Sequence, residues 1–247
     1  EFPVKNERLK VASIEDFSKL PGYPVAYWVS DRVREIFEIS DLLGNIAEPK
    51  QGLATGKNDI FLRLWHEVNL EKIGFYFSNR DEAQKSNLKW FPCNKGGAYK
   101  KWYGNNDYIV NWQNDGYEIR NFKPAVIRNP NYYFKECITW STLTSSNLSL
   151  RYSPKGFISE TKGSGCFLKN SDDLFYVLGI LNSKLVENFI KILSPTIDYH
   201  EGPMSRLPII FTLNPETKSK IDTLAEENIS ISRTDWNSFE TSWDFRV

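Results

Sequence analysis

Cys137-Ile138-Thr139-Trp140-Ser141-Thr142 is rich in β-branched and aromatic residues, the types that are enriched in β-strands. Comparable short runs, separated by glycine, asparagine and proline, occupy residues 108–112, 125–127, 148–152 and 165–168. The sequence therefore predicts a β-rich centre between about residues 50 and 170.

Helical signals flank this centre on both sides. Ser13 and Ser30 stand at N-cap positions, and Gly44 is expected to end the second helix. Residues 171–173 precede an apolar run that predicts one largely buried helix up to Ser194, and residues 214–216 open a last helix. We expect an α+β fold with helical residues at 1–48, a β-rich domain at 49–213 and a C-terminal helical segment at 214–247.

Gly179 lies inside the apolar run at 171–194. Glycine in a helix interior costs roughly 1 kcal/mol relative to alanine, so its presence indicates close packing against a neighbouring element. We expect that neighbour to be the β-rich centre.

Composition limits the class of protein. The chain has 247 residues, of which 40% are hydrophobic and 15% aromatic, and these values exclude general disorder. No apolar stretch approaches the ~20 residues of a membrane span, and the first residues lack the layout of a signal peptide. Three widely spaced cysteines and two histidines favour reduced thiols over disulfides or a structural metal. We expect a cytoplasmic protein that binds neither a membrane nor a metal.

The net charge is zero, but the charges are unevenly distributed. Residues 83–159 contain eleven Lys or Arg and four acids, a balance of +7 that the flanks offset. Within them, residues 89–106 interleave lysines, aromatic rings, glycines and asparagines without a carboxylate. This composition is typical of a surface that binds nucleic acid, and an ordinary surface loop is the alternative.

Two motifs resemble nucleotide or methyltransferase sites without matching them. Residues 52–58 approach a phosphate-binding P-loop, but their glycines are one residue too close and Asn58 replaces the Ser or Thr that would hold magnesium. A glycine-rich turn against a DNA phosphate or base remains possible, as does a plain tight turn. In Asn129-Pro130-Asn131-Tyr132 the third position departs from the Asn-Pro-Pro-Tyr signature of amino-methyltransferases. We predict a turn there and no catalytic constellation in the chain.

Several segments together resemble one family. The resemblance covers nearly the whole chain and includes Leu181-Asn182-Ser183-Lys184 and residues 24–30, 51–65, 89–116, 133–141 and 239–245. These segments resemble the C-terminal half of the adenine-specific DNA methyltransferases of BREX phage defence, the PglX family. The turn at 52–58, the strand at 138–141 and the helix at 181–184 also recur in the target-recognition regions of restriction-modification enzymes.

The resemblance implies a division of labour. An upstream domain outside this chain would bind S-adenosylmethionine (SAM) and carry the catalytic motif, residues 1–48 would connect to it, and residues 49–213 would recognise the DNA site. No cofactor and no methylation are expected of this segment alone. Its partners would be double-stranded DNA, the enzyme's own N-terminal methyltransferase domain and other defence-system proteins.

Candidate DNA-contacting residues come from three kinds of side chain: cations for phosphate or guanine, asparagines for adenine edges, and an aromatic ring for stacking. They are Lys95, Lys100, Lys101, Trp102, Asn105, Asn106, Asn111, Arg120, Lys123 and Arg128, with Gly52, Thr55, Gly56 and Asn58 in the turn. Two other readings stay open: a carbohydrate-binding module, which the Trp and Tyr content favours, and a scaffold for other defence proteins.

Overall fold

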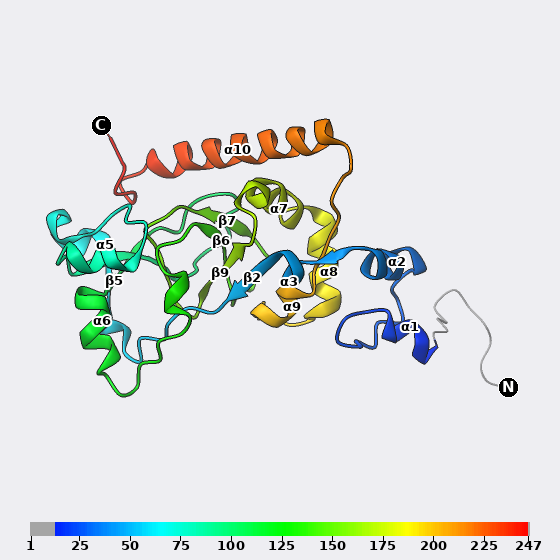
Figure 1. The fold of residues 1–247 in the computed structure, drawn as a ribbon, viewed down its shortest axis with the longest axis horizontal. Helices are drawn as coiled ribbons and strands as arrows, with labels where there is room; N and C mark the ends of the chain where they lie inside the picture. The colour runs from blue at the N-terminus through cyan, green and yellow to red at the C-terminus, as the bar shows by residue number, and fades with distance from the viewer. Residues whose placement is uncertain (1–12, 247) are drawn as a thin grey trace.

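The computed structural model describes residues 13–246, which contain two four-stranded β-sheets lying side by side (Figure 1). The first sheet has the order β2-β9-β6-β7 and is antiparallel throughout. Its strands are β2 (Ala47–Lys50), β9 (Gly163–Leu168), β6 (Cys137–Ser141) and β7 (Leu150–Ser153).

The second sheet has the order β3-β5-β4-β8, and its β4–β8 pair is parallel. Its strands are β3 (Leu62–Leu64), β5 (Tyr108–Asn111), β4 (Trp90–Asn94) and β8 (Ile158–Ser159). A third, two-stranded sheet pairs β1 (Asp41–Leu42) with β10 (Pro208–Ile209).

Helices surround the sheets. The α-helices are α1 (Ile14–Ser18), α2 (Asp31–Ile39), α3 (Leu43–Ile46), α4 (Asn58–Phe61), α5 (Arg80–Lys85), α6 (Gln113–Arg120), α7 (Leu174–Leu181), α8 (Lys184–Leu193), α9 (Glu201–Ser205) and α10 (Pro215–Asn237). Short 3-10 helices cover Trp65–Glu67, Leu70–Lys72, Pro130–Tyr132 and Ser171–Asp173. The α+β class expected from the sequence is confirmed.

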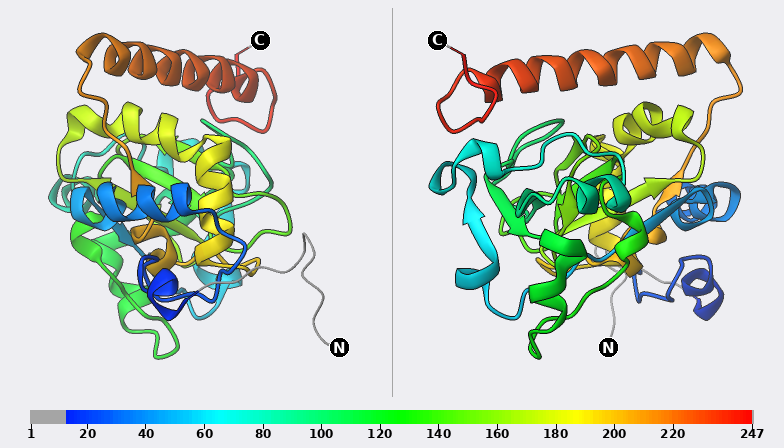
Figure 2. Two further views of the ribbon diagram at one scale, coloured as in Figure 1. Left: turned by 90° about the vertical axis from the view of Figure 1, so that its right-hand side faces the viewer. Right: turned by 60° about the vertical axis from the view of Figure 1, so that its left-hand side comes forward.

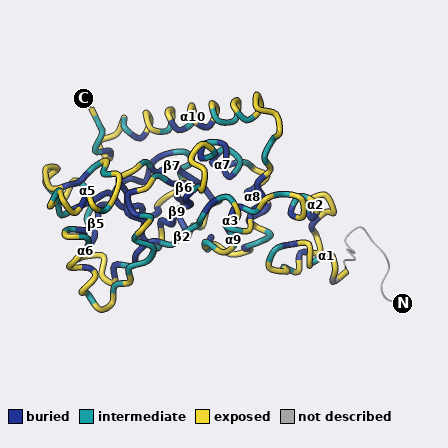
Figure 3. Tube along the Cα trace, viewed as in Figure 1, coloured by how far each residue is buried: buried dark blue, intermediate teal, exposed yellow. Residues whose placement is uncertain are grey.

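Each large sheet has its own hydrophobic core, and Ile73, Trp90 and Ile109 form a third, smaller cluster on the second sheet. In the first, Ile138, Trp140 and Leu150 pack beneath the buried residues of α7 and α8. The indole N–H of Trp140 donates to the carbonyl of Tyr199 at 2.7 Å, so even its polar atom is satisfied. In the second, Phe91 and Val110 pack with residues of α5 and α6. The buried positions in Figure 3 follow these two cores.

The other face of the first sheet carries polar side chains that are buried where the two sheets meet. We call Ser141, Arg151 and Ser153 of this sheet, together with Asn94 of β4, the polar seam; each is at most 5% exposed. The Asn94 amide donates to the Ser153 hydroxyl at 2.8 Å, which links β4 of one sheet to β7 of the other. A Cβ on Gly163 would overlap the backbone of Asn94, so this approach depends on a glycine.

A C-terminal strap, formed by α10 and residues 238–246, runs from α7 toward the second sheet (Figures 1 and 2). At its start Lys218 pairs with Asp173 at 3.5 Å beside α7. At its end the Trp65 indole donates to the carbonyl of Thr241 at 2.9 Å, and Trp243 packs on Phe75. The aromatic C-terminus is thus packed against the second sheet.

The structure differs from the expectation of one helix over residues 171–194. The Asn182 side chain accepts from the N–H of Leu150 and donates to its carbonyl, at 3.1 and 3.0 Å, which ends α7. Ser183 then caps α8 by accepting from the N–H of Val186. The second helix likewise ends at Ile39 and not at Gly44, and residues 125–127 form a single bridge, Ala54 to Val126, in place of a strand.

The division into segments at 1–48, 49–213 and 214–247 stays a prediction, and its first twelve residues lie outside the described part of the chain. Among residues 13–246, no helix has the length and apolarity that crossing a membrane requires.

Replacing Gly179 with leucine is expected to lower the free energy of unfolding by about 1–3 kcal/mol through overpacking. The packing partner is α10, not the sheet: a Cβ at Gly179 would lie 3.1 Å from Cγ2 of Ile221. Urea denaturation measures the effect, with Asn188→Leu on the exposed face of α8 as a size-matched control. A Gly179→Leu variant as stable as the parent would contradict this packing.

Candidate nucleic-acid interface

Residues 52–58 form a turn that is held between two other segments. The N–H of Leu53 donates to the carbonyl of Ser159 at 2.9 Å, and Ala54 exchanges two backbone hydrogen bonds of 2.8 Å with Val126. A Cβ on Gly52 would overlap the carbonyl of Ser159. Gly52 is therefore a packing glycine, and the exposed part of the turn begins at Gly56.

The exposed part of the turn presents Lys57 and Asn58 to solvent. Gly56 adopts φ +70°, a left-handed conformation that favours glycine. The buried Thr55 hydroxyl donates to the side-chain carbonyl of Asn58, which fixes the orientation of that amide. Because a Cβ on Gly56 would lie 2.6 Å from the carbonyl carbon of Pro124, the exposed Lys123 is a close neighbour of the turn.

A groove of about 430 Å³ joins this turn to the basic run. It is lined by Asn58, Arg63, Lys95 and Tyr108, together with Asp59, Leu62, Leu64 and Glu67. The Lys95 ammonium lies 5.9 Å from the centre of the Tyr108 ring and 3.7 Å from the carboxylate of Glu160. Folding thus brings Asn58 and Lys95 to one groove although they lie far apart in the sequence.

Lys100, Lys101 and Trp102 lie farther along the basic run and contact the helices. The Lys100 ammonium sits 5.4 Å from the ring of Trp236 in α10, and the Lys101 ammonium donates to the carbonyl of Asn182 at 2.8 Å. Trp102 is half-buried and pairs by a β-bridge with Arg151. All three side chains or backbones thus contact other parts of the fold, and their contact with DNA stays a prediction.

The three asparagines proposed for adenine edges are buried. Asn105 and Asn106 are 7% and 6% exposed, and the Asn105 amide donates to the carbonyl of Ala98 at 2.8 Å. Asn111 is 2% exposed and donates to Glu118 at 2.7 Å. Contact with a base would require each of these side chains to leave its present site, so their role in DNA reading stays a prediction.

Neither Arg120 nor Arg128 lines the groove. Arg120 covers the ring of Trp112 at 5.1 Å and pairs with Asp115 at 3.2 Å. Arg128 is half-buried, and one of its terminal nitrogens has no hydrogen-bond partner among the described residues.

Lys57, Arg63 and Arg151 were not singled out from the sequence. Lys57 stands inside the glycine turn, and its place between Gly56 and Asn58 was a usable signal. Arg63 reaches the groove from β3 and donates to two nearby backbone carbonyls. Nothing in the sequence marks Arg151 as buried, because charged residues usually face solvent.

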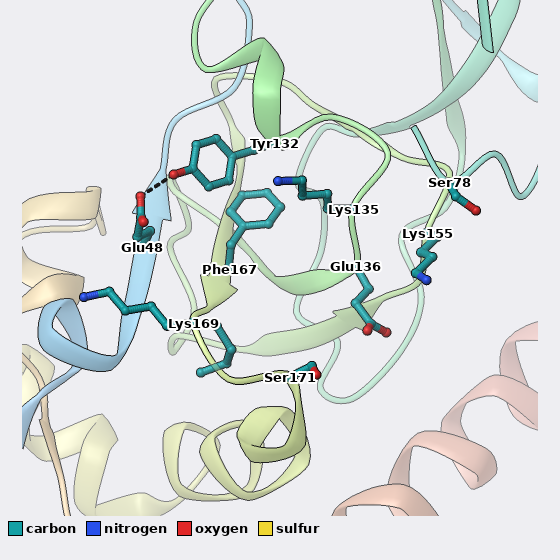
Figure 4. Close-up of a pocket in the computed structure, with 10 residues that line it drawn as sticks. Glu48, Ser78, Tyr132, Lys135, Glu136, Lys155, Phe167, Lys169 and Ser171 are labelled. Atoms are coloured by element: carbon teal, nitrogen blue, oxygen red, sulfur yellow. Dashed lines mark hydrogen bonds between the residues drawn. The ribbon is translucent and has the colours of Figure 1, made fainter. Parts of the chain in front are cut away.

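A second pocket, of about 390 Å³, lies between β2, the end of β9 and the segment before β6 (Figure 4). It combines Lys135 and Lys155 with Glu48 and Glu136. The Tyr132 hydroxyl and the Lys50 ammonium both donate to Glu48, and the bond from Lys50 is the main reason why the pKa of Glu48 lies below its usual value. Lys169 also lines this pocket, and the groove is likewise of mixed charge, since Asp59 and Glu67 accompany Arg63 and Lys95 there.

The three cysteines are poor nucleophiles. Burial raises the pKa of Cys137 to about 12 and raises those of Cys93 and Cys166 further. Thiolates are the reactive form, so these thiols are inert at neutral pH. In residues 13–246, no group of three His, Cys, Asp or Glu is arranged to hold a metal ion.

Two curated proteins are similar to almost the whole chain. Adenine-specific methyltransferase PglX of Lacticaseibacillus casei (strain Zhang) is 42% identical over 238 residues, which cover 93% of this chain and 19% of that protein. Adenine-specific methyltransferase BrxX of Escherichia coli O9:H4 (strain HS) is 39% identical over 233 residues, which cover 93% of this chain and 18% of that protein. The chain thus spans about a fifth of the length of these relatives. No protein-family model matches the sequence.

Proposed function

This chain is homologous to one region of adenine-specific methyltransferases, and from that premise we propose that it recognises the DNA site for such an enzyme. The observation that carries the proposal is the extent of the match, which takes in 93% of this chain but only about a fifth of each relative. A segment of this size beside a separate catalytic part suits a recognition role, because selecting a site and transferring a methyl group use different surfaces.

The surface that we propose for DNA comprises Lys57, Asn58, Lys95 and Lys123. Lys57 and Lys123 are exposed and have no ion-pair partner among the described residues, so their charge is available to phosphate. Asn58 is held in one orientation by Thr55, as base-edge reading requires. Lys95 lines the groove beside them.

Methyl transfer would then be carried out by residues outside this chain. We propose that the rest of the enzyme binds SAM and methylates an adenine extruded from the duplex, as part of a BREX-type phage defence. The chain's other proposed partners are that catalytic part and, beyond it, further defence proteins.

Removing both exposed lysines is expected to reduce the salt dependence of DNA binding. The slope of log affinity against log salt should become shallower by about two units in Lys57→Ala/Lys123→Ala, since each phosphate contact contributes about 0.9. Fluorescence anisotropy with a short mixed-sequence duplex at several salt concentrations measures the slope.

The control is Lys184→Ala/Lys220→Ala, which removes two exposed charges from α8 and α10. Its slope should equal that of the parent. Equal losses in both double variants would indicate a non-specific charge effect, and a parent chain that fails to bind duplex at low salt would refute the proposed function.

A further inference from the structure

Arg151, in the polar seam, is a buried cation without a carboxylate partner. Its side chain is 2% exposed, and in residues 13–246 no acid lies within ion-pair distance of it. Its terminal nitrogens donate to the carbonyl of Lys100 at 3.4 Å and to the hydroxyl of Ser141 at 3.5 Å, both long contacts. Its Nε has no acceptor in the described chain.

Such an arrangement is unfavourable for folding by itself. Burial lowers the pKa of Arg151 only to about 10, so the guanidinium stays charged at neutral pH. Taking an unpaired charge out of water costs several kcal/mol, and a neutral side chain of similar volume is often as stable or more stable. The buried charge therefore calls for a reason beyond packing.

The loop at residues 96–101, which Arg151 contacts through the carbonyl of Lys100, offers such a reason. Gly96 and Gly97 have φ values of +82° and +148°, and the Ser141 hydroxyl, which contacts Arg151, bonds both the N–H and the carbonyl of Gly97. The N–H groups of the next four residues, 98–101, have no acceptor within the described residues, and Ala98 and Tyr99 are exposed. The loop thus combines successive donors that lack a protein acceptor with a buried positive charge that contacts its Lys100 carbonyl.

Successive backbone N–H groups that converge in a turn form an anion-binding concavity. Here the anion would stand outside the loop, Arg151 would lie on its inner side, and the half-buried Lys100 would flank it. Of the acids beside this loop, Glu160 pairs with Lys95 at 3.7 Å. Asp107 interacts with Lys100, and burial raises the pKa of Asp107.

We propose that residues 98–101 bind a phosphate group and that Arg151 is the buried counter-charge of this site. The loop N–H groups donate to the phosphate oxygens, while Arg151 acts through the loop as a positioning and electrostatic residue. The identification of the phosphate as one of the DNA backbone rests on the proposed function; the phosphate chemistry of the loop does not.

The first test uses the parent chain with inorganic phosphate alone. In 1H–15N NMR spectra, phosphate is expected to shift the amide resonances of residues 98–101 more than those of the rest of the chain. Shifts confined to other residues, or no shifts, would overturn the site without any variant having to fold.

The second test compares Arg151→Met with Arg34→Met. Arg34 is also buried, at 6% exposure, but it pairs with Asp31 at 2.7 Å in α2, so its loss should leave ligand binding unchanged. Arg151→Met should keep the melting temperature of the parent or exceed it, abolish the phosphate shifts and weaken duplex binding roughly tenfold. Arg151→Lys, which keeps the charge, should retain the phosphate shifts even if the methionine variant fails to fold.

The outcomes separate the two proposals. Arg151→Met that binds phosphate and duplex like the parent refutes the counter-charge, as does an Arg151→Lys that folds but loses phosphate. A parent whose loop binds phosphate but not duplex supports the site and refutes the DNA function; its ligand would then be a smaller phosphorylated molecule.

Discussion

Trp140→Ala is expected to lower the free energy of unfolding by about 3–5 kcal/mol, a large share of the 5–15 kcal/mol typical of a folded domain. Trp140 is fully buried in the first core, so truncation leaves a cavity that the strands of a paired sheet cannot close. It also leaves the buried carbonyl of Tyr199 without its donor, which adds a desolvation penalty.

Urea denaturation followed by circular dichroism measures this loss. Trp28→Ala is the matched control, because Trp28 is 57% exposed and its removal should change stability by less than about 0.5 kcal/mol. Similar losses in the two variants would mean that Trp140 does not anchor the first core.

Gly52→Ala is expected to destabilise the chain by about 3 kcal/mol or more, at the upper end of overpacking effects. The added methyl group would overlap the backbone carbonyl of Ser159, and backbone cannot move aside as a flexible side chain can. The displaced strand end would also disturb the hydrogen bond from Leu53 to Ser159.

The control for this substitution is Gly202→Ala in α9. No atom lies within 4 Å of a Cβ at Gly202, so alanine there causes no overpacking, and its small helix-propensity gain is offset because Gly202 precedes Pro203. Thermal unfolding of Gly202→Ala should therefore stay close to that of the parent while Gly52→Ala falls well below it, and a parent-like Gly52→Ala would contradict the packing role of this glycine.

The fold was predictable where local signals dominate. The strand around Trp140 and the cap at Asn214 follow from propensity and capping chemistry, and α10 begins where they indicate, with the Asn214 side chain accepting from the N–H groups of Glu216 and Thr217. The break at Asn182 was not predictable, because it depends on a hydrogen-bonded contact with Leu150, 32 residues away.

The candidate site shows the same limit. The basic run was recognisable from its composition, but composition cannot tell which lysines meet a tertiary partner. Lys101 is bound to the carbonyl of Asn182 and Asn111 to Glu118, whereas Lys57 and Lys123 are exposed. Arg151 could be found only from the packed structure, since its significance is its burial without an acid.

The C-terminal strap is expected to couple the thermal unfolding of the two sheets. Two sheets with separate cores would ordinarily melt in two steps, but the strap contacts both sheets. Ile221 packs on α7, and Trp243 packs on Phe75, which belongs to the small cluster of Ile73, Trp90 and Ile109 on the second sheet. Unfolding of either sheet would remove one set of these contacts, so the stabilities of the two sheets are thermodynamically coupled. The chain should consequently unfold as one cooperative unit, with a single calorimetric transition.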